Sequence, residues 1–393
     1  MSRPSAFVPF NRPYVTGDEF VHMREAIDNA HLSGNGPFSE RCRGWLEETV
    51  GSLRALLTHS CTGALEMAFT LADVGPGDEV VLPSFTFVST ANAVVARGGT
   101  PVFVDIRPDT LCIDESALED AVTSRTRAIV PVHYAGIACD MGRIGEIAEE
   151  RTVLVVEDAA HGVLAAVDGR ALGGIGHLGA LSFHETKNLS CGEGGALLVN
   201  DERFVERAEV VYEKGTNRQR FFRGEVDKYT WVDVGSSYVL SDLAAAYLWA
   251  QFEHASEITA LRRSVWDRYH EGFADLEEKG VVRRPIVPTN CTHNAHTYYL
   301  LLDDLATRTA LIRELAERSV NAVFHYVPLH ASPSGARYGR SVGDLATTTS
   351  VSERLVRLPL WAGMTDRDVE HVVDGVHASL APASRARRTN TRR

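Results

Sequence analysis

Along the first 200 residues, continuous apolar runs alternate with stretches of polar or helical pattern. Short Val- and Ile-rich runs lack polar alternation, and polar or helical stretches separate them. Continuous apolar strands separated by helices are typical of a mainly parallel sheet that is covered on both faces. We therefore predict an α/β fold with strands at 55–58, 79–85, 100–106, 127–132, 152–157, 178–183 and 196–199.

Helical spacing of apolar residues predicts the remaining elements. In the first half we expect helices at 17–31, 39–50, 117–122 and 142–150, and another that begins after Ser60. One long helix at 241–276 leads into a second region with strands at 297–302 and 320–326 and helices at 306–318 and 366–380. The predicted organisation is an extended arm (1–14), a large domain (15–250), a smaller C-terminal α+β domain (251–382) and a disordered Arg-rich tail (383–393).

Composition and charge exclude several classes of function. The 393 residues are 44% hydrophobic and 23% charged, as in an ordinary soluble globular protein. Because 40 basic and 52 acidic residues give a net charge of −12, we expect no nucleic-acid partner. No membrane-length apolar run or signal region is found, so we expect a cytoplasmic protein. The six cysteines form no C-x-x-C pair, and we expect neither a metal site nor disulfides.

Lysine is scarce in this chain. Of 40 basic residues only four are lysines, namely Lys187, Lys214, Lys228 and Lys279. Arginine stays protonated, whereas a desolvated lysine can lose its proton and attack a carbonyl. Lys187 lies in a loop between two apolar runs, among small neighbours that let a flat ligand come close to the backbone. A loop lysine is more often a solvated charge, but these neighbours make Lys187 our candidate Schiff-base residue.

A second candidate site is the strand-to-helix turn at residues 59–68. Free backbone amides and the helix dipole at such a turn favour an anion, and a phosphate would lie at Thr62 and Gly63. N-capping by Ser60 or Thr62 explains the same residues equally well.

Functional residues are also predicted where strands end. Ligands of a parallel sheet gather at the C-terminal ends of its strands, where Phe87, His133 and Asp158 fall. The chain contains no G-x-G-x-x-G or G-x-x-x-x-G-K-[ST], so the usual dinucleotide and P-loop fingerprints are missing.

Together, these positions describe a pocket for pyridoxal 5'-phosphate. Lys187 would hold its aldehyde, and Asp158 would keep the pyridine nitrogen protonated. Thr62 and Gly63 would hold the phosphate, and Phe87 would stack on the ring.

Residues 213–231 are predicted to form a long loop that carries five cations and four aromatic residues. Such a patch is either a solvated surface or a binding surface for phosphates and a planar base.

The motifs that carry these residues resemble the DegT/DnrJ/EryC1/StrS sugar aminotransferases, a family within the fold-type I, aspartate aminotransferase-like enzymes. The resemblance covers nearly the whole chain except the tail and rests on residues 83–87 (PSFTF), 156–162 (VEDAAHG), 182–188 (SFHETKN) and 192–195 (GEGG). Within the family, the chain looks most similar to TDP-4-keto-6-deoxyhexose 4-aminotransferases of the enterobacterial common antigen type, through residues 9–11, 132–136, 214–218, 226–231 and 324–330.

The resemblance implies further cofactor contacts. Ser182 should bond the cofactor phosphate, and Asn217 should reach the cofactor phosphate of a neighbouring subunit, which requires a homodimer with shared active sites. His161 stands where many relatives carry Gln, near the phenolic oxygen of the ring. The segment between Lys187 and Gly192 is one residue shorter than in the enterobacterial type, which affects the local loop shape.

The resemblance also implies the reaction. The amino group of L-glutamate would pass through the cofactor to C4 of TDP-4-keto-6-deoxy-D-glucose, giving the 4-amino-4,6-dideoxy gluco or galacto sugar. The nucleotide sugar would contact Lys214, Arg218, Arg220, Lys228, Tyr229 and His325.

Other functions are compatible with parts of the pattern. Some relatives are dehydratases with His in place of the lysine, which Lys187 argues against. Another nucleotide keto-sugar with a C3 ketone is an alternative substrate. A pyridoxal-phosphate-binding regulator without catalysis would not need both Asp158 and Lys187, and a Rossmann-type oxidoreductase would need the missing glycine fingerprint.

Overall fold

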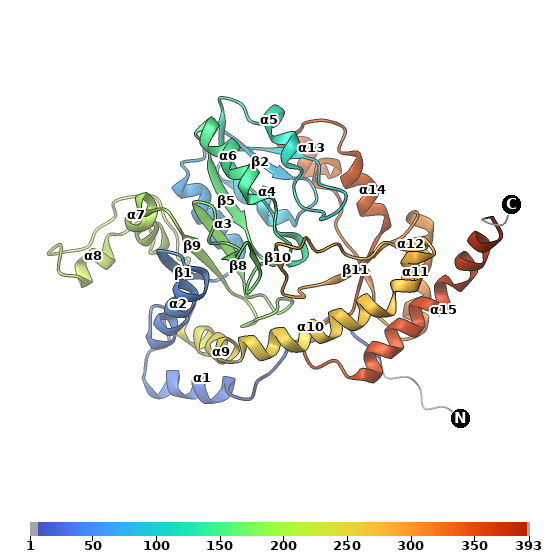
Figure 1. The fold of residues 1–393 in the computed structure, drawn as a ribbon. Helices are drawn as coiled ribbons and strands as arrows, with labels where there is room; N and C mark the ends of the chain where they lie inside the picture. The colour runs from blue at the N-terminus through green and yellow to red at the C-terminus, as the bar shows by residue number, and fades with distance from the viewer. Residues whose placement is uncertain (1–6, 391–393) are drawn as a thin grey trace.

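The structure, a computed structural model, describes the backbone of residues 7–390 and the side chains of residues 7–381. Its centre is an eight-stranded sheet with the order β1-β9-β8-β5-β4-β2-β3-β13 (Figure 1). β9 runs antiparallel to both of its neighbours, whereas the other pairs are parallel. The predicted α/β fold is confirmed, with strands β1 (Arg54–Thr58), β9 (Gly195–Val199), β8 (Leu178–Ser182), β5 (Leu154–Asp158), β4 (Thr126–Ile129), β2 (Glu79–Pro83), β3 (Thr100–Val104) and β13 (Arg340–Ser341).

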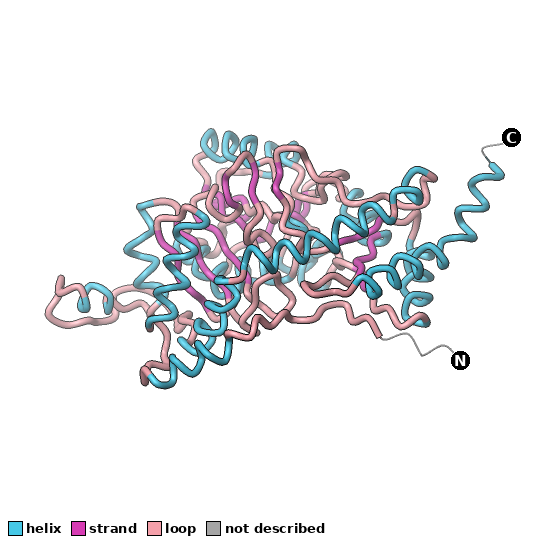
Figure 2. The backbone as a smooth tube through the Cα atoms, turned by 60° about the horizontal axis from the view of Figure 1, so that its bottom comes forward, coloured by secondary structure: helices cyan, strands magenta, loops and turns pink. Residues whose placement is uncertain are grey.

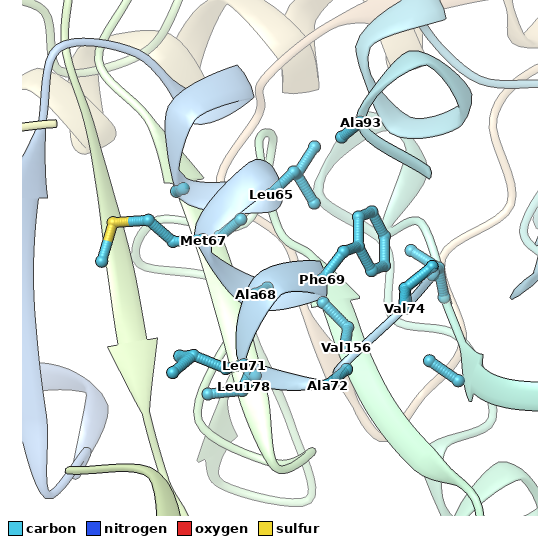
Figure 3. Packing of buried hydrophobic residues seen from close by; sticks show 14 of the residues in the cluster. Leu65, Met67, Ala68, Phe69, Leu71, Ala72, Val74, Ala93, Val156 and Leu178 are labelled. Atoms are coloured by element: carbon cyan, nitrogen blue, oxygen red, sulfur yellow. The ribbon is translucent and has the colours of Figure 1, made fainter. Parts of the chain in front are cut away.

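Both faces of this sheet are buried, which is why its strands lack polar alternation. Val80 and Leu82 point into a core with α3, α4 and α7, while Val81 points into the core on the opposite face with α5 and α6. Figure 3 shows α3 packed through Leu65, Met67 and Phe69 in the first of these cores. The helices around the sheet are α1 (Glu19–Asp28), α2 (Pro37–Val50), α3 (Cys61–Leu71), α4 (Val88–Ala96), α5 (Leu118–Ala121), α6 (Met141–Arg151), α7 (Glu202–Tyr212) and α9 (Asp242–Glu253).

The C-terminal region has its own three-stranded antiparallel sheet in the order β11-β14-β12. Its buried side chains share a core with α10, α12 and α15. The predicted strand at 297–302 and helix at 306–318 are confirmed, whereas α13, α14 and β14 were not predicted. The elements are β11 (Tyr298–Leu301), β12 (Val323–Phe324), β14 (Leu355–Leu358), α10 (Ala255–Gly272), α11 (Ala274–Glu278), α12 (Leu305–Glu317), α13 (Pro333–Tyr338), α14 (Ala346–Arg354) and α15 (Asp366–Asn390).

The single long helix predicted at 241–276 is wrong. The chain breaks at His254 and again at Phe273, so that α9, α10 and α11 follow one another. The His254 imidazole bonds to Asp18 at 3.0 Å and Glu257 at 3.1 Å, contacts that stabilise the bend. No Gly or Pro stands beside His254, so the helical pattern gave no signal for the first break, whereas Gly272, directly before Phe273, was a signal for the second.

Three other expectations need correction. The loop predicted at 213–231 contains the short helix α8 (Arg218–Phe222). The strand predicted at 320–326 is only β12. Residues 383–390, predicted to be disordered, continue α15 as a helix, in keeping with the high helix propensity of Ala and Arg. Residues 1–6 of the expected arm and 391–393 of the expected tail lie outside the described residues.

Two strand pairs join the large and C-terminal regions. β13 pairs in parallel with β3 at the edge of the large sheet. A small sheet in the order β10-β6-β7 pairs Cys291–Thr292 with Ala166–Val167, beside Arg170–Ala171. The domain boundary at residue 250 therefore stays a prediction. In the described chain no helix is long and apolar enough to cross a membrane.

Candidate active site

A cavity of about 500 Å³ lies where the large sheet meets the C-terminal sheet. The starts of α3 and α4, the ends of β5 and β8 and the loop after β8 form one side of its wall. Residues beside β11, β12 and β14 form the other side, and Phe10 and Asn11 of the N-terminal segment also contribute. The C-terminal ends of parallel strands thus open into this cavity, where such sheets bind ligands.

Lys187 lies in the loop that follows β8, with its side chain lining the cavity. Its backbone amide donates to the carbonyl of His184 at 2.9 Å, which fixes the turn. Burial lowers the pKa of Lys187 to about 8. A substantial fraction of the amine is therefore neutral near pH 8, which a nucleophile or a proton carrier requires.

Asp158 ends β5, lines the same cavity as Lys187 and is 5% exposed. One carboxylate oxygen accepts a hydrogen bond from the Thr90 hydroxyl at 2.7 Å, and the other accepts from the backbone amide of Ala160 at 3.1 Å. Because Thr90 donates its proton to Asp158, the 3.1 Å bond between the two threonine hydroxyls must come from Thr86. The chain thereby fixes a carboxylate that can hold a protonated ring nitrogen.

The start of α3 shows how residues 60–63 relate to the two explanations given for them, a helix N-cap and a phosphate site. Ser60 is the N-cap, and its hydroxyl accepts from the Gly63 amide at 3.1 Å. Gly63 does not line the cavity, so the expected phosphate contact through Gly63 is not supported. Thr62 does line it, and in the described chain the amides of Cys61 and Thr62 have no protein acceptor. Two free amides at a helix start remain available to an anion.

Three of the five histidines that line the cavity are His161, His296 and His325. Burial lowers the pKa of each well below the ordinary range, and neighbouring cations lower it further, so all three are neutral at pH 7. The backbone amide of Ala135 donates to Nδ1 of His161 at 3.2 Å, which places the proton of this neutral ring on Nε2. His161 can therefore donate to the phenolic oxygen that the family resemblance places beside it.

The rings of these histidines are held by their neighbours. The His161 and His296 rings stack with centroids 4.0 Å apart and planes 24° apart. Nδ1 of His296 lies 2.9 Å from Oδ1 of Asn188, and Nδ1 of His325 lies 3.0 Å from the hydroxyl of Tyr134. These contacts fix the orientation of the groups that face the cavity.

The structure brings together most of the residues predicted around the cofactor. Ser182 ends β8 inside the cavity, and Phe87 stands at the start of α4 with 58% of its surface exposed. The predicted residues that line the cavity are Thr62, Phe87, His133, Asp158, His161, Ser182, Lys187 and His325.

The predicted basic loop does not join this cavity within one chain. Residues 213–236, here called the α8 segment, extend away from the body of the molecule in both views (Figures 1 and 2). Within the single chain, the residues predicted to contact the nucleotide sugar are therefore divided, with His325 in the cavity and the others outside it. The predicted residues found on the α8 segment are Lys214, Asn217, Arg218, Arg220, Lys228 and Tyr229.

Sequence reasoning missed two arginines of the cavity, Arg262 on α10 and Arg357 on β14. It also missed His296 and Thr90. A signal existed for Arg357, because it interrupts the apolar run Leu355-Val356-Arg357-Leu358. A cation within a buried strand is rare unless it has a partner or a ligand.

Comparisons with known proteins agree with this architecture. The family model described as "DegT/DnrJ/EryC1/StrS aminotransferase family" matches residues 13–377. The spore coat polysaccharide biosynthesis protein SpsC of Bacillus subtilis is 34% identical over 378 residues, which cover 94% of this chain and 96% of SpsC.

Solved structures give the same picture. The aminotransferase TlmJ from Streptoalloteichus hindustanus is 32% identical with a TM-score of 0.88, over 96% of this chain and 100% of TlmJ. Spr1654 from Streptococcus pneumoniae, solved in a PLP-form, is 24% identical with a TM-score of 0.88, over 96% of this chain and 99% of Spr1654. At that identity the second likeness shows the fold.

Proposed function

Because this chain belongs to the DegT/DnrJ/EryC1/StrS aminotransferase family, and is thus a pyridoxal-phosphate-dependent sugar aminotransferase, we propose that it transfers the amino group of L-glutamate to C4 of TDP-4-keto-6-deoxy-D-glucose. The product is TDP-4-amino-4,6-dideoxy-D-glucose or its galactose isomer. The observation that carries the proposal is the meeting of Lys187 and Asp158 in one cavity, with the pKa of Lys187 lowered to about 8. The motifs at 214–218, 226–231 and 324–330 support C4 as the position.

The residues of the cavity suit pyridoxal phosphate. The free amides of Cys61 and Thr62 and the hydroxyl of Ser182 match the phosphate, and the Asp158 carboxylate matches a protonated pyridine nitrogen. Phe87 provides an aromatic face at the rim. When bound, the cofactor supplies an electron-withdrawing ring that stabilises negative charge at the carbon that loses its proton.

Lys187 carries the proton in both halves of the reaction. Its neutral amine removes a proton from Cα of the amino-acid donor, and its ammonium form returns a proton to C4 of the sugar. The lowered pKa of Lys187 makes both protonation states accessible near neutral pH. The face of C4 that meets Lys187 decides between the gluco and galacto products.

The active site is completed by a second copy of the chain in a homodimer. Asn217 of one subunit reaches the cofactor phosphate of the other, and the cations of the α8 segment bind the TDP group there. This arrangement is supported by the α8 segment's projection from its own body and by its exposed aromatic rings, with Trp231 76% and Phe222 62% exposed. Aromatic residues with interspersed arginines are typical of protein interfaces.

A deoxysugar of a natural product or a surface glycan is the expected destination of the product. The relative SpsC, named for spore coat polysaccharide biosynthesis, supports the second of these.

The test is turnover of the purified holoenzyme with L-glutamate and TDP-4-keto-6-deoxy-D-glucose, followed by NMR of the sugar. Formation of a 4-amino sugar together with 2-oxoglutarate is expected, and the coupling constants at C4 identify its stereochemistry. The Lys187→Ala variant should form neither product. If turnover occurs only with a sugar that carries a C3 ketone, the amino group is transferred to C3 and not to C4. If the protein binds pyridoxal phosphate and shows no turnover, it is a regulatory protein.

A further inference from the structure

Two arginines line the cavity, and within the described part of the chain only one of them has hydrogen-bond partners. Arg262 donates to the backbone carbonyls of Ala295 at 3.2 Å and His296 at 2.6 Å. The guanidinium of Arg357 makes no hydrogen bond or ion pair with any residue in the described part of the chain, and its buried Nε has no acceptor. Arg262 therefore supports the backbone of the wall, whereas the hydrogen-bond donors of Arg357 remain available.

The surroundings of Arg357 do not compensate its charge. Its strand neighbours Val356 and Leu358 are buried, and the Phe10 ring lies 4.8 Å from the guanidinium carbon. Burial lowers the pKa of Arg357, although arginine remains protonated at neutral pH. A cation held in this way without hydrogen-bond acceptors is unfavourable unless a ligand supplies them. The missing partner is an anion that enters the cavity.

We propose that Arg357 is the carboxylate subsite of the amino-acid donor and that its guanidinium binds the α-carboxylate while Phe10 covers it from outside. This inference rests on the proposed function, because it names the residue that recognises the donor in the same cavity. A guanidinium matches a carboxylate in a planar, bidentate geometry.

The position of Arg357 favours an α-carboxylate over the diphosphate of the sugar. Arg357 lines the same cavity as Lys187, His161 and His325, and its charge contributes to the lowered pKa of each of these groups. An α-carboxylate is attached to the same carbon as the amino group that is transferred. In the nucleotide sugar, several bonds and the pyranose ring separate the diphosphate from C4.

This subsite explains how one cavity accepts two unlike substrates. The keto-sugar carries no carboxylate, so its binding does not use Arg357 in the same way. Loss of Arg357 should therefore weaken the donor and leave the sugar almost unaffected.

The experiment compares the holoenzymes of Arg357→Gln and Arg357→Lys with the wild type. The KM of L-glutamate should rise roughly 10- to 100-fold in Arg357→Gln, as expected for the loss of a charged hydrogen-bonded contact. The KM of the TDP-sugar should change less than about 2-fold by the same reasoning. Arg357→Lys, which keeps the charge, should recover part of the affinity for glutamate.

A matched control is Arg283→Gln. Arg283 is also partly buried, and its Nε and Nη2 lack partners, but it does not line the cavity. Its substitution should leave both KM values unchanged. L-Glutamine, which keeps the α-carboxylate and lacks the γ-carboxylate, is measured as a donor or a competitive inhibitor, and its affinity should fall in Arg357→Gln as that of glutamate does.

Three results would overturn the inference: an unchanged KM for glutamate in Arg357→Gln, a larger rise for the TDP-sugar than for glutamate, or an effect on glutamate without one on glutamine. A separate readout is calorimetric binding of glutarate, which should weaken in Arg357→Gln by a similar factor. If the wild type exchanges amino groups between amino and oxo acids but rejects every nucleotide sugar, the sugar assignment fails, and the same donor measurements still decide the role of Arg357.

Discussion

The reactivity of Lys187 comes from its surroundings and not from the amino acid itself. Burial in the cavity stabilises the neutral amine relative to the ammonium ion, and the Arg357 charge adds to this effect. The Asp158 carboxylate acts in the opposite direction and limits the shift.

The first prediction at the residue scale concerns the pH dependence of cofactor attachment. The rate at which added pyridoxal phosphate becomes covalently attached to cofactor-free protein should rise with pH and level off above about 8, since the neutral amine attacks. Absorbance changes after mixing measure this rate. Lys187→Arg should not attach the cofactor. An inflection near the ordinary lysine pKa, about 10.4, would contradict the lowered pKa of Lys187.

A second residue-scale prediction concerns Thr90, which was invisible from sequence. Thr90→Val removes the 2.7 Å hydrogen bond to Asp158 and should lower kcat/KM roughly 10-fold or more, as losing a hydrogen bond to a charged group does. Steady-state kinetics measure the loss. Thr86→Val, which removes only the bond to Thr90, should have a smaller effect, and equal effects would argue against a role through Asp158.

Between elements, one buried carboxylate holds β13 beside the large sheet. Glu79 on β2 receives hydrogen bonds from Arg340 at 2.9 and 2.8 Å and from Thr123 at 2.8 Å, and Arg125 also contacts it. The hydrogen bonds from Arg340 are the largest cause that lowers the pKa of Glu79 to about 2. The two-residue strand β13 is therefore held in the sheet by the Arg340 side chain as well as by its backbone pairing with β3.

At the scale of elements, Glu79→Gln should destabilise the protein by ~2 kcal/mol at pH 7, because it removes the charge from the hydrogen bonds between this buried carboxylate and the partly exposed guanidinium groups of Arg340 and Arg125. Denaturant unfolding measures the change. Since the folded pKa of Glu79 is depressed, its stabilisation is complete above about 4.5 and is lost as pH falls toward about 2. The difference between variant and wild type should therefore shrink over that window.

The exposed pair Arg24–Asp28 provides a control for Glu79. Its side chains are 76% and 62% exposed, and Arg24→Ala should change stability by less than ~0.5 kcal/mol. A difference between Glu79→Gln and wild type that stays constant from pH 7 to pH 3 would argue against the depressed pKa of Glu79.

At the scale of the whole molecule, the α8 segment stands apart from its own cavity. Asn217 instead accepts a hydrogen bond from the Thr230 amide at 2.7 Å, which closes the base of the segment. The segment's cations pair with local acids, as Arg220 does with Glu206 and Glu225, both at 3.1 Å. These contacts stabilise its shape while leaving its outer surface available to a second subunit.

At the scale of the whole molecule, two variants that are each expected to be inactive test whether the subunits share their active sites. Lys187→Ala and Asn217→Ala subunits, unfolded together and refolded, should recover about a quarter of wild-type turnover, because half of the dimers are mixed and each has one intact shared site. Turnover of the mixture compared with each variant alone measures the recovery. Absence of recovery, with mixed dimers present by native mass spectrometry, would mean that Asn217 serves its own subunit.

The sequence by itself determined the sheet, the family and several of the residues that line the cavity. Continuous apolar runs indicate strands that are buried on both faces. Asp158 and Lys187 lie within or beside such runs, so local pattern was enough to find them, whereas Ser182 was implied by the family resemblance. The same reasoning failed at 254, where side-chain contacts rather than Gly or Pro accompany the break, and it overlooked Gly272 beside the break at 273.

Only the tertiary structure decided which distant residues share the cavity. Arg357 and His296 approach Lys187 because β14 and the segment before β11 fold against the large sheet, over sequence separations that no local pattern encodes. The lowered pKa of Lys187 and the unpaired state of Arg357 also depend on that burial. Secondary structure follows largely from residues that are close in the sequence. The pKa of a side chain, its desolvation and its fit to a ligand depend instead on residues that are close in space.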